Sequence, residues 1–152
     1  MTEWHHSIDA SIELIRVASD SDVRGCSQDD IDRLEGSSGV QLPDAYRRFL
    51  RGIGQAAGDF MSGSDFCLGF LERIQRGARE MAGDSGCAVP QTYFVFFSHQ
   101  GYEYLLLDTE SGANPSVYYL GEGAVELRAL EQTFAEWFSS TVREEFGRAG
   151  ES

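Results

Sequence analysis

The chain has 152 residues, and 41% of them are hydrophobic, which is enough apolar material for the core of one ordinary domain. Its 25 acidic residues outnumber 12 basic residues and give a formal net charge of −13 at pH 7. This charge argues against nucleic acid and anionic membranes as partners and favours association with a basic partner.

The cysteines and the N-terminus point to the cytoplasm. Cys26, Cys67 and Cys87 are widely spaced and include no C-x-x-C pair, so we expect free thiols in a reducing compartment. The first residues lack a basic region followed by an apolar run, so no signal peptide is expected. No apolar run has the length needed to span a bilayer.

Helical signals dominate the first half of the chain. Ile8, Ile12 and Ile15 recur at helical spacing and predict an amphipathic helix over 7–17. A second helix is predicted to follow Ser27, which has the residue type of an N-cap, and to end at the glycines of 36–39.

A third, short helix is predicted from Pro43 to the glycines at 52 and 54. Pro43 suits the first helical position, where its missing N–H has no cost, and Tyr46 and Phe49 share one face. Because so short a helix is marginal alone, its aromatic face must pack on something larger.

The middle of the chain predicts two brief strands and a fourth helix. The strands are predicted at 60–61 and 66–68, where apolar residues are flanked by Gly and Asp. The helix is predicted over 70–81, with Phe70, Leu71 and Ile74 on one side.

An antiparallel sheet is predicted next. The segments 93–97, 102–108 and 116–120 are rich in aromatic and β-branched residues and are joined by short, turn-rich links. Large side chains on both faces predict that helices cover at least part of this sheet. Apolar residues from Leu130 to Phe146 then follow helical spacing, and Thr133 with Glu136 has the capping-box pattern.

These elements predict an α+β fold. We expect a single domain over residues 1–152, with a core from about 7 to 146, in which a central antiparallel or mixed β-sheet (meander) packs against several helices.

Sequence-local signs of catalysis or metal binding are weak. His5 and His6 have no acidic or thiol partner at ligand spacing, and His99 lies in a predicted turn without a nucleophile beside it. Asp59 and Asp65 could seat a divalent cation, but solvation of their loop is the simpler interpretation because the alternating carboxylates of a calcium loop are missing. No phosphate-binding loop or nucleophile elbow occurs. We therefore predict no catalytic, cofactor-binding or metal-binding residues and no enzymatic activity.

Acidic residues are unevenly distributed. The stretch 80–127 contains no Arg or Lys, and it contains these carboxylates: Glu80, Asp84, Glu103, Asp108, Glu110, Glu122 and Glu126. Two interpretations fit equally: a solvated acidic surface, or a docking face for a cationic protein. These seven residues are the candidate partner-binding set.

The order of the parts is also characteristic. The segment Val-Gln-Leu-Pro-Asp-Ala-Tyr-Arg-Arg-Phe-Leu at 40–50 follows Gly-Ser-Ser-Gly at 36–39 and precedes a glycine-containing break. Strand-like segments at 94–97, 101–108 and 115–120 and a closing helix around 134–138 come later. Over about 31–146 this order resembles the SUKH superfamily, which includes domains similar to the yeast cell-wall-assembly regulator (Smi/Knr) and many bacterial immunity proteins. One departure is the break itself, which reads Gly-Ile-Gly-Gln instead of an Asn-Gly-Gly type.

The resemblance implies a function in binding. In bacteria it implies an immunity protein that binds and neutralises a cognate toxin, commonly a nuclease or another polymorphic toxin domain. Immunity proteins of nucleases are often acidic because their toxins are basic, which matches the stretch 80–127. The alternative is an intracellular scaffold or regulatory protein-binding module of the Smi/Knr type without a toxin partner. A small-ligand binder or undetected enzyme would require a deep pocket with convergent polar groups.

Overall fold

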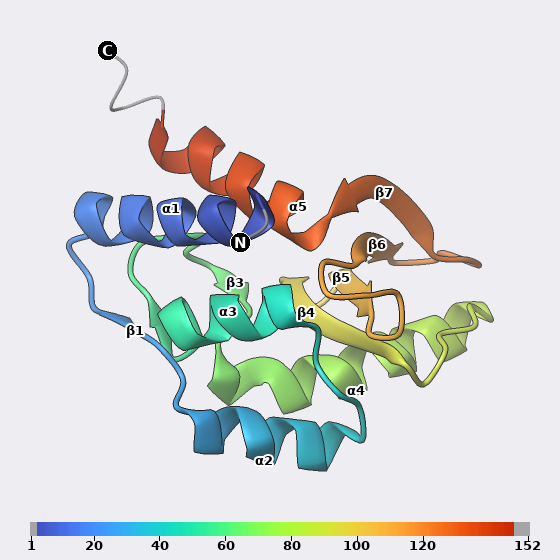
Figure 1. Ribbon diagram of the computed structural model, residues 1–152. Coiled ribbons are helices and arrows are strands. Elements are labelled where there is room, and N and C mark those ends of the chain that lie inside the picture. Colours follow the sequence, from blue (N-terminus) through green and yellow to red (C-terminus); the bar gives the residue numbers. More distant parts are fainter. Residues whose placement is uncertain (1–2, 148–152) are drawn as a thin grey trace.

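The computed structural model describes residues 3–147 and confirms the α+β fold class (Figure 1). The helices are α1 (Glu3–Ala18), α2 (Gln28–Ser38), α3 (Asp44–Ile53), α4 (Leu68–Ser85) and α5 (Phe134–Val142), the last continued by a π-helical turn, Arg143–Gly147. The strands are β1 (Val23–Arg24), β2 (Ala56–Ala57), β3 (Ser64–Asp65), β4 (Tyr93–His99), β5 (Glu103–Asp108), β6 (Ser116–Gly121) and β7 (Arg128–Thr133).

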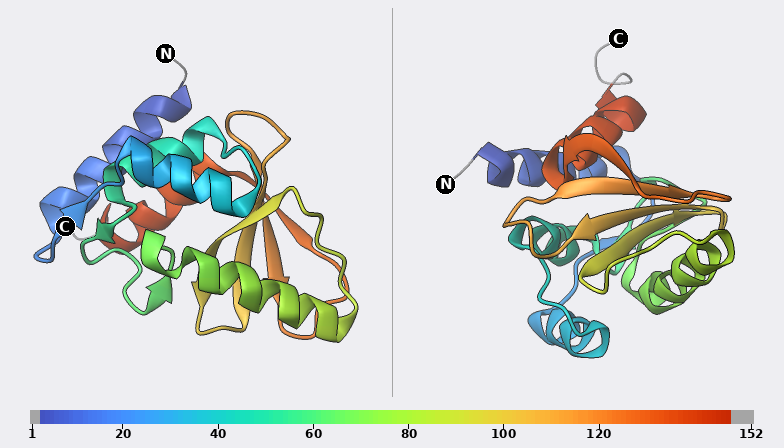
Figure 2. Two further views of the ribbon diagram at one scale, coloured as in Figure 1. Left: turned by 90° about the horizontal axis from the view of Figure 1, so that it is seen from below. Right: turned by 90° about the vertical axis from the view of Figure 1, so that its right-hand side faces the viewer.

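The main sheet is an antiparallel meander, as the short links predicted. Its strand order is β3-β4-β5-β6-β7, while β1 and β2 pair separately. The β4–β5 hairpin turns through Gln100 and Gly101, both at positive φ, the combination that a type I′ turn requires. Figure 2 shows α5 and α4 on opposite sides of this sheet, so helices cover both of its faces.

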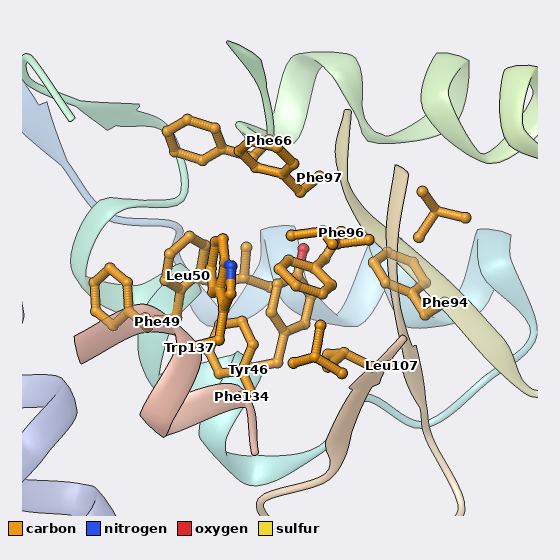
Figure 3. Close-up of a cluster of buried hydrophobic side chains, with 14 of the residues drawn as sticks. Tyr46, Phe49, Leu50, Phe66, Phe94, Phe96, Phe97, Leu107, Phe134 and Trp137 are labelled. Atoms are coloured by element: carbon orange, nitrogen blue, oxygen red, sulfur yellow. The ribbon is translucent and has the colours of Figure 1, made fainter. Parts of the chain in front are cut away.

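The aromatic core lies between α3, α5 and β4 (Figure 3). At its centre is Tyr46 of α3, which is fully buried and whose ring centroid lies 5.7 Å from that of Phe49, 5.5 Å from Phe94 and 5.6 Å from Phe134. Edge-to-face and tilted pairs of this kind contribute about 0.5–1.5 kcal/mol each beyond the area they bury. The aromatic face of the short helix therefore packs on the sheet, as its length required.

The ends of α3 differ in detail from the prediction. Pro43 is the N-cap, and the helix begins at Asp44. Gly52 lies inside the helix and Gly54 has a φ of −66°. Both backbone conformations are open to any residue, so neither position requires glycine for a positive φ. They are needed for space: a Cβ on Gly52 would stand 2.4 Å from Ile12 Cδ1, and one on Gly54 would stand 2.5 Å from Cys26 Sγ.

The strands predicted at 60–61 and 66–68 are wrong. Residues 58–63 form turns, β3 contains only Ser64 and Asp65, and Cys67 is the N-cap of α4. Phe60 reaches the core from a turn and Phe66 reaches it from the link between β3 and α4, so neither apolar residue pairs in a sheet. The prediction that Phe70 shares the buried side of this helix with Leu71 and Ile74 is also wrong. Phe70 is 40% exposed, and the Arg73 guanidinium lies 4.9 Å from the centre of its ring.

The predicted helical pattern from Leu130 onward includes a strand. Residues 128–133 form β7, and α5 begins only at Phe134. The capping box fixes that start, because Thr133 Oγ1 accepts from the Glu136 N–H and the Glu136 carboxylate accepts from the Thr133 N–H. Leu130 precedes this cap and shares the phase of the helix by chance.

Close backbone packing beside α3 gives a first prediction. A Cβ on Gly25 would stand 1.6 Å from the Arg51 carbonyl oxygen, so Gly25→Ala is expected to lower the free energy of unfolding by about 2–3 kcal/mol. Gly36→Ala is the matched control: nothing lies within 4 Å of its Cβ position in α2, so alanine should raise stability by about 0.5–1 kcal/mol. Urea denaturation of both variants measures the difference, and equal stabilities would contradict the packing.

The buried hydroxyl at the centre of the core gives a second prediction. Tyr46 Oη has no hydrogen-bond partner among residues 3–147, so Tyr46→Phe should leave the free energy of unfolding unchanged or raise it by up to about 1 kcal/mol. Tyr104→Phe is the control, because Tyr104 Oη donates to the Gly101 carbonyl and its loss should cost about 0.5–1.5 kcal/mol. A larger loss for Tyr46→Phe than for Tyr104→Phe in urea denaturation would refute this.

Candidate functional site

One end of the main sheet carries a hollow lined by acidic residues. Glu103 is the first residue of β5, and Glu122 and Glu126 lie in the loop that joins β6 to β7. These three carboxylates line a hollow of about 330 Å³ together with Tyr102 and Tyr119. The antiparallel pairing of β5 with β6 matches Glu103 to Gly121, and this register brings residues distant in sequence to the same end.

The second half of α4 approaches the same end. The Ser85 hydroxyl donates to the Ala124 carbonyl in the β6–β7 loop, and Asp84 is exposed beside it. Glu80 lies within electrostatic reach of the Tyr104 hydroxyl, which itself bonds the β4–β5 turn. Five candidate residues thus gather at this end of the sheet. We call these five the acidic end: Glu80, Asp84, Glu103, Glu122 and Glu126.

The other two candidates, Asp108 and Glu110, lie at the opposite end of β5. A six-residue strand places its ends about 17 Å apart. Asp108 shapes its own loop, because its carboxylate accepts from the Glu110 N–H at 3.1 Å and its carbonyl accepts from Ser111 Oγ at 2.9 Å. The seven candidates therefore divide into two groups and do not form one surface.

Arg128 adds positive charge to the acidic end, which the sequence did not predict. Its guanidinium lies 4.6 Å from the centre of the Tyr119 ring and borders the same hollow. Burial raises the pKa of Tyr119, and the adjacent Glu103 carboxylate adds to the rise. The cation-free stretch ends one residue before Arg128, and the sequence predicts a helix from Leu130, two residues after Arg128, where the structure has β7. The Gly-Glu-Gly turn signal at 121–123 could have indicated a further hairpin strand.

Comparison with known proteins identifies the family. The family model described as SMI1 / KNR4 family (SUKH-1) matches residues 25–140, which is most of the chain. The chain belongs to this SMI1 / KNR4 (SUKH-1) family. Among curated proteins, no match was found. SUKH domains are generally binding or immunity domains and not enzymes.

The polar residues considered for chemistry in this SUKH-1 domain have structural partners. His99 is the last residue of β4, half-buried, with its Nδ1 3.0 Å from Ser64 Oγ. Asp59 accepts from the Asp20 N–H at 3.0 Å, and hydrogen bonds led by the Ser21 side chain lower the pKa of Asp59. Asp65 pairs with Arg73 at 3.0 Å. Asp59 therefore stabilises a turn, and Asp65, which lies in β3, is held by an ion pair to α4.

His5 and His6 lie in the first turn of α1, where the His5 ring stacks on Trp4 with centroids 3.6 Å apart. Within residues 3–147, no group of three or more His, Cys, Asp or Glu side chains is arranged to hold a metal ion. None of the helices in the part of the chain that the structure describes combines the length and apolar character needed to cross a bilayer.

Proposed function

We propose that this chain is an immunity protein that binds and neutralises a cognate bacterial toxin by protein–protein contact, with no catalysis of its own. The acidic end is its proposed docking surface, and the proposed partner is a basic toxin domain of the nuclease type. The observation that carries the proposal is the gathering of five carboxylates at one end of a SUKH-1 domain, where Arg128 is the one cation among residues 3–147 that lines the hollow.

Electrostatics supports a basic partner. With a net charge of −13, the whole chain attracts cationic proteins, and the concentration of carboxylates at one end directs them there. Such attraction acts mainly on the association rate and weakens with salt, because the Debye length falls to about 8 Å at physiological ionic strength. A toxin that must bind nucleic acid cannot lose its basic surface without losing its activity.

The acidic end is also ordered before binding. The Glu122 N–H donates to the Tyr102 carbonyl at 3.1 Å, so the β4–β5 turn and the β6–β7 loop are tied together. Tyr102 is 40% exposed, and tyrosine is a frequent anchor of protein interfaces. Because this surface is held in place by backbone hydrogen bonds, less ordering entropy is lost when a partner binds.

The first test is neutralisation. The chain is co-expressed with the toxin encoded beside its gene, and we expect growth to be rescued and the two proteins to co-purify. Tyr102→Ala with Glu122→Arg should abolish rescue, whereas Glu110→Arg, the same charge reversal at an exposed position beyond the opposite end of β5, should keep it. No rescue and no complex with the unaltered chain would reject the proposal. A chain with no toxin gene beside it that instead binds host proteins would support the scaffold or regulatory alternative.

The second test changes single charges in both directions. Glu122→Gln and Glu126→Gln should each slow association with the toxin domain, and Arg128→Gln should accelerate it. The expected effect is about two- to fivefold per charge at low salt, because one surface charge contributes up to about 1 kcal/mol. Glu110→Gln, at the opposite end of β5, removes the same charge and serves as the control. Stopped-flow rates that do not differ among the four variants would exclude the acidic end as the docking surface.

A further inference from the structure

A second hollow lies between α2 and α4. It has a volume of about 350 Å³, and the start of β4 forms part of its lining. Figure 2 (left) shows α2 and α4 on the side of the molecule that faces the viewer. We call it the α2–α4 groove.

Side chains of α4 hold the edge of β4 beside this groove. β3 pairs only with Ser98 and His99, which leaves the rest of that edge without a neighbouring strand. The Gln75 amide takes the place of a strand, because Nε2 donates to the Val95 carbonyl at 2.6 Å and Oε1 accepts from the Val95 N–H at 2.8 Å. The lining of the groove is therefore ordered, and an added β-strand cannot pair with Val95.

Arg79 supplies an uncompensated positive charge. Its guanidinium donates to the Tyr93 carbonyl at 3.0 Å and to the Val89 carbonyl at 3.3 Å. Among residues 3–147, no carboxylate forms an ion pair with it. Arg76, one helical turn earlier, is 4.0 Å from Glu72, and both of these side chains are more than two-thirds exposed, so this pair is weak.

The remainder of the lining combines apolar side chains and small hydroxyls with the Gln91 amide and the Glu72 carboxylate that pairs with Arg76. Leu34 and Val40 come from the α2 side, Leu71 comes from α4, and Ser37 and Ser38 stand at the C-terminal end of α2. An apolar surface beside two arginines suits a ligand that combines an apolar side chain with a carboxylate. A basic segment, the kind of partner proposed for the acidic end, would meet like charge here.

We propose that the α2–α4 groove is a docking site for an acidic-apolar segment of a partner protein. In this segment Asp or Glu lies beside Leu, Ile, Val or Phe. Its carboxylate pairs with Arg79 and Arg76, and its apolar side chain packs on Leu34, Val40 and Leu71. The assignment goes beyond the proposed toxin-neutralising function and does not depend on it.

Peptide selection tests the groove without any toxin. Random twelve-residue peptides displayed on phage are selected against the immobilised full-length protein, and the enriched sequences are measured as synthetic peptides by fluorescence anisotropy. We expect enriched peptides to carry Asp or Glu next to an apolar residue. Replacing that acid by its amide should weaken binding at least about tenfold, which corresponds to 1.4 kcal/mol for a charge-assisted pair. Enrichment of peptides without carboxylates, or of none, would overturn the proposal.

Two variants locate the binding. Ser37→Glu adds a negative charge to the rim of the groove and should weaken the binding of the enriched peptides about two- to fivefold, the effect of one surface charge. Ser62→Glu makes the same change in an exposed turn outside the groove and should not. Because Arg79 also bonds two carbonyls, Arg76→Gln with Arg79→Gln is a second variant, used only where its thermal melt matches that of the unaltered protein.

Equal affinity for Ser37→Glu and Ser62→Glu would overturn the groove assignment. A dimer that forms with rising protein concentration and is lost in Ser37→Glu would identify a second copy of the chain as the occupant and would equally overturn it. Failure of the toxin to bind leaves these outcomes unaffected, so the two proposals fail separately.

Discussion

The rest of the structure depends on the insertion of the α3 aromatic face between β4 and α5. Tyr46 contacts rings from both neighbours, and Phe49 packs edge-on against Phe134 and Phe138. A ten-residue helix has little stability of its own, so this packing both forms the helix and joins the sheet to the helices on that face.

The same insertion explains why glycines surround α3. The backbone at Gly25 lies directly against the last turn of the helix, and Gly52 leaves room for Ile12 of α1. These positions fix how closely α1 and the segment after β1 approach α3. Because the packing is close, the position of α3 fixes the positions of α1 and of the segment after β1.

The sequence predicted best the elements whose ends are fixed by local chemistry. The capping boxes at Ser27 and Thr133 place two helix starts, and the short links identify the meander. Prediction from the sequence failed where a buried side chain does not belong to the kind of secondary structure that its spacing indicates. Phe60 is buried from a turn, and Leu130 lies in a strand although it continues the helical phase of α5. Periodicity cannot separate these cases because it records only which side chains are apolar.

The candidate site shows the same limit in another form. A stretch of sequence without Arg or Lys does not determine which of its carboxylates lie close together in space. Each turn of a meander reverses the direction of the chain, so neighbours in sequence can lie at opposite ends of the sheet. Glu103 and Glu122 meet because β5 and β6 are antiparallel, and the same strand carries Asp108 about 17 Å away. Arg128 reaches the acidic end through β7, one residue beyond the run.

Surfaces of opposite sign border one helix. The residues of α4 from Leu71 to Arg79 line the α2–α4 groove, and Glu80 and Asp84, nearer its C-terminus, border the acidic end. If one partner used both proposed surfaces, it would have to present a basic face and an acidic-apolar segment in a fixed order. Reversing that order would place like charges together, and such repulsion is a general means of selecting one binding orientation.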